Sequence, residues 1–137
     1  MSLLLNVLLY LWQLPQNLLA HILLWFYKEE CVYMYKEIAF HICPGFPSGI
    51  SLGCHAIVKS LPYSTQAKKT IDHEWGHTRQ SRKWGWLYLI VIGLPSLLGN
   101  IYDRLFHKKW TAKDRTKWYY SLPWENSADS YGGVWRG

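Results

Sequence analysis

Two histidines and a glutamate at residues 73–77 have the types and the spacing needed to bind and use a metal ion. The segment reads His73-Glu74-Trp75-Gly76-His77. Residues four apart lie one turn from each other on the same face of an α-helix, so His73 and His77 could both reach one ion. Glu74 would then lie beside the ion, where a carboxylate can take a proton from water that the metal activates. The sequence therefore predicts a metal-dependent hydrolytic site on a helix.

The surrounding residues must form that helix, and residues 64–84 have the composition to do so. Ser64 or Thr65 could cap its start, no proline interrupts it, and Gly85 could end it. Gly76 is unfavourable inside a helix by roughly 1 kcal/mol, so we interpret it as a point that a substrate or another helix approaches closely. The alternative is a surface helix that carries two histidines by chance.

A third ligand is needed, because a catalytic zinc usually has three protein ligands and one open position. The chain offers Glu125 and Asp129 in the segment ENSAD, and on a helix these two acids would again share one face. We predict Glu125 as the ligand. Two alternatives remain open: Asp129 is the direct ligand and Glu125 lies outside the site, or both acids are solvated groups that complement a helix dipole.

The two motifs together, HExxH and a downstream ExxAD, resemble the gluzincin class of zinc metallopeptidases. The chain is similar to a very small member of the membrane-embedded branch of that class, although the resemblance covers only the two motif segments. It implies one Zn²⁺ ion held by His73, His77 and Glu125. It further implies that Glu74 is the general base and that Asp129 fixes one ligand histidine through its second ring nitrogen.

The chain departs from that class in size and in one functional group. The known membrane enzymes are much larger. The 47 residues between His77 and Glu125 are few, but they are sufficient for a helical hairpin that returns to the site. No residue is a secure match for the side chain that steadies the tetrahedral oxyanion. The candidates for this role are Tyr131 and His107, followed by Tyr119 and Tyr120.

Composition favours one domain associated with a membrane. The 137 residues include nine Trp and ten Tyr, and half of them are hydrophobic. The net charge of +6 arises from residues 59–137, which hold thirteen of the fifteen Lys and Arg. Because aromatic residues are enriched beside long apolar segments, we expect the basic residues 59–137 to contact a lipid bilayer. We expect no binding of nucleic acid, because the chain has no nucleic-acid-binding motif. If the chain spans the bilayer, the basic residues would place the catalytic half on the cytoplasmic side.

Two apolar segments could contact the membrane. Residues 1–28 are long enough to span it, but Pro15 should kink the helix, so a spanning helix and one that lies in the interface are both open. Residues 86–102 are short for a span, and the break at Gly93-Leu94-Pro95 predicts a bent helix or a re-entrant hairpin. A buried core helix is the alternative.

The remaining segments complete the predicted fold. Residues 30–60 read as a small antiparallel β element, whose last strand could align an extended substrate beside the metal. Residues 111–133 should form short C-terminal helices that carry the third ligand. The expected fold is therefore mainly α with a small antiparallel β element, an α+β arrangement that forms a minimal zincin-like metallopeptidase core.

These expectations lead to one main hypothesis and two alternatives. The main hypothesis is a zinc metalloendopeptidase that hydrolyses peptide bonds at or in a membrane. A non-catalytic, zinc-stabilised membrane scaffold is the first alternative, although such a protein would not need Glu74. A protein that permeabilises bilayers through its apolar N-terminus is the second.

Overall fold

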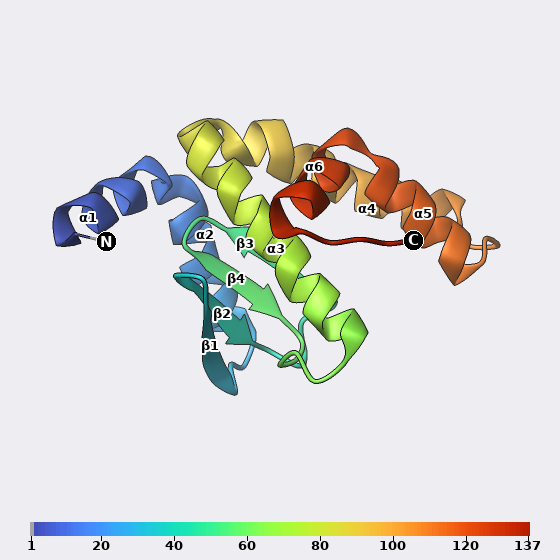
Figure 1. Ribbon diagram of the computed structural model, residues 1–137, viewed down its shortest axis with the longest axis horizontal. Coiled ribbons are helices and arrows are strands. Elements are labelled where there is room, and N and C mark those ends of the chain that lie inside the picture. The colour runs from blue at the N-terminus through green and yellow to red at the C-terminus, as the bar shows by residue number, and fades with distance from the viewer. Residues whose placement is uncertain (1) are drawn as a thin grey trace.

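The computed structural model describes residues 2–137 and has the predicted α+β organisation. The described residues form six α-helices and a four-stranded sheet (Figure 1). In chain order the elements are α1 (Leu3–Trp12), α2 (Leu14–Phe26), β1 (Cys31–Tyr35), β2 (Ile38–Ile42), β3 (Ile50–Leu52), β4 (His55–Val58), α3 (Thr65–Trp84), a 3₁₀ turn (Gly85–Leu87), a π-helical turn (Leu89–Gly93), α4 (Leu94–Phe106), α5 (Ala112–Ser121) and α6 (Pro123–Gly132). Helices α4, α5 and α6 lie on the far side of α3 from the strands (Figure 1).

The sheet is mixed, so the prediction of a purely antiparallel β element was wrong. The strand order is β1-β2-β4-β3, with β2 and β4 parallel and the other two pairs antiparallel. After β2 the chain crosses to the far edge to form β3 and then returns as β4 between β3 and β2. The apolar run Ala56-Ile57-Val58 is buried throughout, and this burial on both faces suits a central strand. The predicted last strand, near residues 50–59, is thus a β3–β4 hairpin.

Helices cover both faces of the sheet. On one face Phe40 and Val58 pack with Ile71 of α3, and Figure 1 shows α3 lying across the strands. On the other face Ile57 packs with Leu23 and Leu24 of α2. Alternate residues of β4 therefore anchor α3 and α2 to opposite sides of one small sheet.

Helix α3 matches the predicted metal-binding helix of residues 64–84. Ser64 caps its start by accepting a hydrogen bond from the backbone of Ala67. Gly85 follows its last residue with φ of +53°, a conformation that a residue with a side chain rarely adopts. Eight of its residues are buried, including both histidines of the motif and the glutamate between them.

The N-terminal apolar segment is two helices, not one kinked helix. α1 and α2 meet at Gln13 with a bend of 83°, and Pro15 lies in the first turn of α2, where a missing N–H is tolerated. The buried Gln16 donates hydrogen bonds to Ser81 and to the carbonyl of Gly85. Polar residues of this segment thus attach α2 to the end of α3.

The second apolar segment is one helical rod. It runs through the π-helical turn into α4, and Leu89–Phe106 is the one described helix long and apolar enough to cross a membrane, with a mean hydropathy of 1.3. The α1–α2 pair passes the same test only if its bent halves are counted together. Because Leu89–Phe106 is one continuous helix, the re-entrant hairpin does not describe it, and because only 11% of it is buried, neither does the buried core helix.

The C-terminal segment forms α5 and α6 as predicted. Thr111 caps α5 through its side chain, and Pro123 lies in the first turn of α6. Gly133 ends α6 in the left-handed conformation with φ of +70°. The hairpin of α5 and α6 returns the segment 125–129 to α3.

Candidate metal centre

The two motif helices touch at their backbones. A Cβ atom built on Gly76 of α3 would lie 1.9 Å from the carbonyl oxygen of Ala128 in α6. At the other end of the crossing, a Cβ on Gly132 of α6 would lie 2.0 Å from the carbonyl oxygen of Asp72. The prediction that another helix approaches Gly76 closely is confirmed, and this approach brings Glu125 to the histidines.

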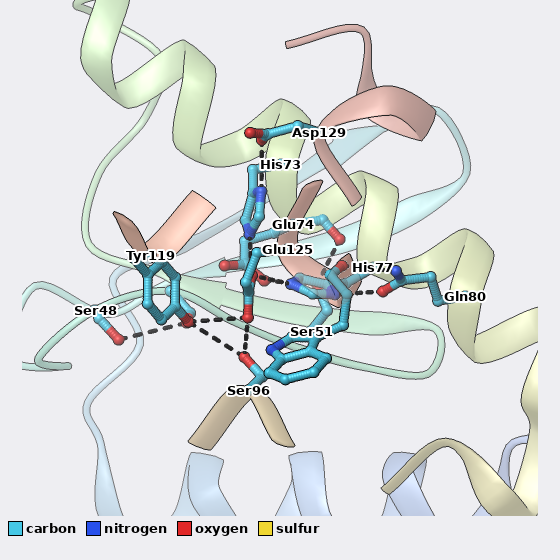
Figure 2. A network of polar contacts seen from close by, with 12 residues as sticks. Ser48, Ser51, His73, Glu74, His77, Gln80, Ser96, Tyr119, Glu125 and Asp129 are labelled. Carbon is cyan, nitrogen blue, oxygen red and sulfur yellow. Dashed lines mark hydrogen bonds and ion pairs between the residues drawn. The ribbon is translucent and has the colours of Figure 1, made fainter. Parts of the chain in front are cut away.

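His73, His77 and Glu125 converge on one point. Their candidate ligand atoms all lie within 4.8 Å of one another (Figure 2). Glu125 Oε2 lies 2.9 Å from His73 Nε2 and 3.0 Å from His77 Nε2. Two ligands of one tetrahedral zinc lie about 3.3 Å apart. The side chains are at most 5% exposed, and Glu125 is fully buried.

Each histidine is oriented by a partner on its outer nitrogen. His73 Nδ1 lies 2.7 Å from Asp129 Oδ1, and His77 Nδ1 lies 2.6 Å from Gln80 Oε1. Gln80 donates its own N–H to the carbonyl of Trp124, so its oxygen faces the ring. Both partners accept a hydrogen bond from a protonated Nδ1, which directs the two Nε2 atoms at the centre.

This arrangement fits a metal cation. With protons on both Nδ1 atoms, two Nε2 atoms and a carboxylate oxygen face one another in a buried space, where either a metal ion or a proton on a histidine can supply the positive charge that such a set of acceptors favours. Burial alone would lower the pKa of His73, but hydrogen bonds to Asp129 and Glu125 raise that pKa to about 9. Burial would likewise raise the pKa of Glu125, and the two histidines instead hold it well below its usual range. A buried His-His-Glu triad of this kind could hold a metal ion.

The second carboxylate oxygen of Glu125 is held separately. Tyr119 donates its hydroxyl to Glu125 Oε1 at 3.0 Å, and Ser96 of α4 donates to the same oxygen. Burial and the neighbouring charge of Glu125 raise the pKa of Tyr119, so it remains a neutral donor. These two hydroxyls leave only Oε2 for the histidines, and Glu125 would bind a metal through one oxygen.

Glu74 lies beside the triad and is anchored by the sheet edge. Ser51 of β3 lies 2.9 Å from Glu74 Oε2 and 2.5 Å from the Glu74 carbonyl. A Cβ on Gly49 would lie 2.9 Å from Glu74 Oε1. Glu74 Oε2 therefore faces the hydroxyl of Ser51, and Glu74 Oε1 faces the backbone of Gly49.

Asp129 is fixed from the side opposite His73. Arg136 donates Nε to Asp129 Oδ2 at 2.7 Å and Nη2 to Oδ1 at 3.0 Å. Burial would raise the pKa of Asp129, but His73 and Arg136 hold it below its usual value. The guanidinium also lies 3.3 Å from the ring centroid of Tyr120. Asp129 thus occupies the position predicted for the acid that orients a ligand histidine, and Glu125 occupies that of the ligand.

Of the four predicted candidates for oxyanion binding, the structure brings two to the triad. The Tyr120 ring packs edge-on against His73 with centroids 4.9 Å apart, and Tyr119 binds Glu125. His107 instead hydrogen-bonds Asp103, and Tyr131 is 46% exposed. Neither His107 nor Tyr131 forms a hydrogen bond or ring contact with the triad in the described part of the chain.

Several side chains at the site were not identified from the sequence. Gln80 could have been found, because it lies three residues after His77 and therefore on the same helix face. Ser51, Ser96 and Arg136 come from a strand, an apolar helix and the C-terminal segment. No local pattern marks them, since only the tertiary fold brings them near the motif.

Three other histidines form a separate cluster on the central strands β2 and β4, on the face of the sheet that α2 covers. The His55 ring lies 4.9 Å from that of His21 and 5.1 Å from that of His41. His41 Nε2 lies 3.0 Å from His55 Nδ1, and Tyr10 of α1 contacts His21. This cluster joins the N-terminal helices to the sheet, and its ligand atoms do not converge as those of the triad do.

Comparisons of the chain with protein-family models, with curated proteins and with solved structures found no match. The function is therefore inferred from the residues of the site itself.

Proposed function

We propose that this protein is a zinc-dependent metalloendopeptidase that hydrolyses peptide bonds at or in a membrane. The observation that carries the proposal is the convergence of His73, His77 and Glu125 beside Glu74. Two imidazole nitrogens and one carboxylate oxygen are the ligand set of many catalytic zinc sites, which keep a fourth position open. The gluzincin resemblance agrees with these roles.

The protein's residues would divide the chemistry among them. A bound zinc would supply the activation of water and the polarisation of the scissile carbonyl. Glu74 Oε1, which faces Gly49, takes a proton from the attacking water, and Ser51 holds the other oxygen. Glu74 then passes this proton to the leaving nitrogen as the C–N bond breaks. Tyr120 is the group we assign to the developing oxyanion, since its ring lies against His73.

The proposed location of this activity is the surface or interior of a lipid bilayer. α1, α2 and α4 expose large apolar side chains, among them Leu4, Trp25, Leu97 and Phe106, each more than half exposed. Side chains of this kind transfer favourably from water into lipid. The protein should float with anionic phospholipid vesicles in a density gradient, and a protein that remains monomeric and soluble without detergent or vesicles would contradict this location.

The metal and the chemistry can be tested together with Glu74→Gln. Wild-type protein purified under metal-replete conditions should contain about one zinc per chain and cleave a peptide library. Glu74→Gln should retain the zinc and lose cleavage by a factor of about 10² to 10⁴, because a general base contributes about that much. Zinc content is measured by elemental analysis, and cleavage by mass spectrometry.

Glu37→Gln is the matched control, because it makes the same chemical change at a side chain that is 60% exposed. It should leave zinc content and cleavage unchanged. Absence of zinc from the metal-replete wild type would refute the proposal. Full zinc occupancy without cleavage of any peptide would assign the metal a structural role instead.

A further inference from the structure

Two clefts of different character meet at Glu74. One has a volume of about 410 Å³ and the other of about 530 Å³. His73 lines only the first, and His77 lines only the second, whereas Glu74 lines both. The clefts also share Gly49, Asn100 and Tyr119 as walls. A chain that passes Glu74 would therefore extend into a different cleft on each side.

The walls of the two clefts differ in polarity. The cleft beside His73 has a mixed lining, in which polar groups of the β4–α3 loop and the start of α3, including Lys59, Ser60, Gln66 and Thr70, alternate with apolar ones such as Val58 and Ala67. It is the more polar of the two. We call it the polar cleft.

The cleft beside His77 is lined mainly by apolar side chains. These come from α2, the β2–β3 loop and the α4 rod, and include Leu19, Phe46, Leu89, Leu94 and Leu97. We call it the apolar cleft.

The apolar cleft opens onto the surface that we assign to the bilayer. Its wall residues Leu94, Leu97 and Ile101 are 49%, 57% and 43% exposed, and they belong to the one described helix that is both long and apolar enough to span a membrane. An apolar segment held in lipid could therefore enter this cleft without crossing water. The polar cleft has no comparable apolar wall.

From this geometry we infer the substrate class: a membrane-inserted polypeptide cut where an apolar segment gives way to a polar one. This inference rests on the proposed peptidase function and specifies its substrate. The apolar side of the scissile bond occupies the cleft beside His77, and the polar side occupies the cleft beside His73. Specificity arises because a polar side chain in the apolar cleft loses its hydrogen bonds to water, and an apolar side chain in the polar cleft contacts fewer apolar walls than it would in the other cleft.

The test uses the full-length, metal-replete protein in detergent micelles and four synthetic peptides. Two peptides join an apolar block of about six residues to a polar block of the same length, in either order, so that each block spans roughly 20 Å. The third has the same composition with the two kinds of residue alternating, and the fourth is polar throughout. One block order should be cut at the block boundary with a kcat/KM at least about tenfold higher than that of the alternating peptide.

The outcomes separate this inference from the function on which it rests. Cleavage of the alternating and polar peptides at the same rate as both block peptides would refute the inference and leave the peptidase function standing. No cleavage of any peptide by zinc-loaded protein would refute the peptidase function, and the inference with it.

Adjacent leucines on α4 give a matched pair of variants. Leu97 lines the apolar cleft and is 57% exposed, whereas Leu98 is 56% exposed and lies outside it. Leu97→Asn should lower kcat/KM for the preferred block peptide by about tenfold, mainly through KM, and leave the polar peptide unaffected. Leu98→Asn should change neither. Equal effects of the two substitutions would mean that the exposed apolar surface, and not the cleft, determines specificity.

Discussion

Gly76 is one of the two points at which the helices that carry the proposed zinc ligands touch, and Gly76→Ala should separate them. The added Cβ would meet the carbonyl oxygen of Ala128 at 1.9 Å, whereas ordinary contact begins at 3.4 Å, so α6 must retreat by about 1.5 Å. Glu125 lies one turn before Ala128 and would move with it. Metal–ligand distances tolerate deviations of only about 0.2 Å, so the displacement is several times larger than the site can absorb.

The expected result is a large loss of zinc affinity with a smaller loss of stability. Overpacking costs about 1–3 kcal/mol, and replacing a helical glycine by alanine returns roughly 1 kcal/mol. We therefore expect the free energy of unfolding of the metal-free protein to fall by at most about 2 kcal/mol. Zinc affinity should fall by more than the 10- to 100-fold that is typical when a ligand loses its orienting partner. Thermal unfolding in chelator measures the first quantity, and competition with a coloured chelator measures the second.

Two other glycines provide controls. Gly45→Ala adds its Cβ where nothing lies within 4 Å and should change neither quantity. Gly132→Ala produces a clash of similar size, 2.0 Å from the Asp72 carbonyl, but seven residues beyond Glu125. It should cost similar stability with a smaller loss of zinc affinity. Wild-type zinc affinity in Gly76→Ala would refute the assignment of Glu125 as a ligand carried by a closely packed α6.

Three further predictions concern single side chains. Gln80→Leu removes the acceptor from His77 Nδ1 and should weaken zinc binding by about 10- to 100-fold in the same chelator competition; unchanged affinity would show that the amide does not orient the ring. Tyr120→Phe should lower kcat by about 10²- to 10³-fold with zinc content unchanged, and an unaltered kcat would exclude the tyrosine from oxyanion binding. Burial and the neighbouring histidines lower the pKa of His55 from 6.5 to about 4. Between these two pH values the unfolded chain binds more protons than the folded protein, so the free energy of unfolding falls as the pH falls through this range. Unfolding measured at pH 7 and pH 5 should show an acid loss that is smaller in His55→Gln by up to about 2 kcal/mol; an identical loss in the variant would refute this account.

The parts of this site that could be predicted from the sequence are those with a fixed helical spacing. His73 and His77 lie four residues apart, as do Glu125 and Asp129, and the structure places each pair on a buried helix face. The limits of α3 could also be predicted, because Ser64 caps its start and Gly85 adopts the positive φ that ends it. Local rules were sufficient here, because one turn of helix determines which side chains share a face.

The sheet and the apolar segments were harder to predict, because their arrangement depends on distant partners. Nothing between β2 and β3 indicates that the chain passes to the far edge of the sheet, which is what makes β4 parallel to β2. The β1–β2 turn uses Lys36 and Glu37, both with positive φ, where sequence patterns would favour asparagine or glycine. The 83° bend at Gln13 is larger than a proline kink, because buried polar side chains there bind the end of α3.

The position of α3 explains how a chain of this length can hold the whole site. The sheet anchors one face of α3 through Ile71, and α6 packs against the α3 backbone at Gly76. The segment 73–77 is therefore held by direct contact with both the sheet and α6. Glu125 is in turn hydrogen-bonded by Ser96, which belongs to the exposed apolar rod. The helix that we assign to the membrane is therefore one hydrogen bond away from a predicted metal ligand. Any shift of α4 relative to α6 changes the contacts of Glu125 Oε1, and with them the direction in which Oε2 faces the two histidines.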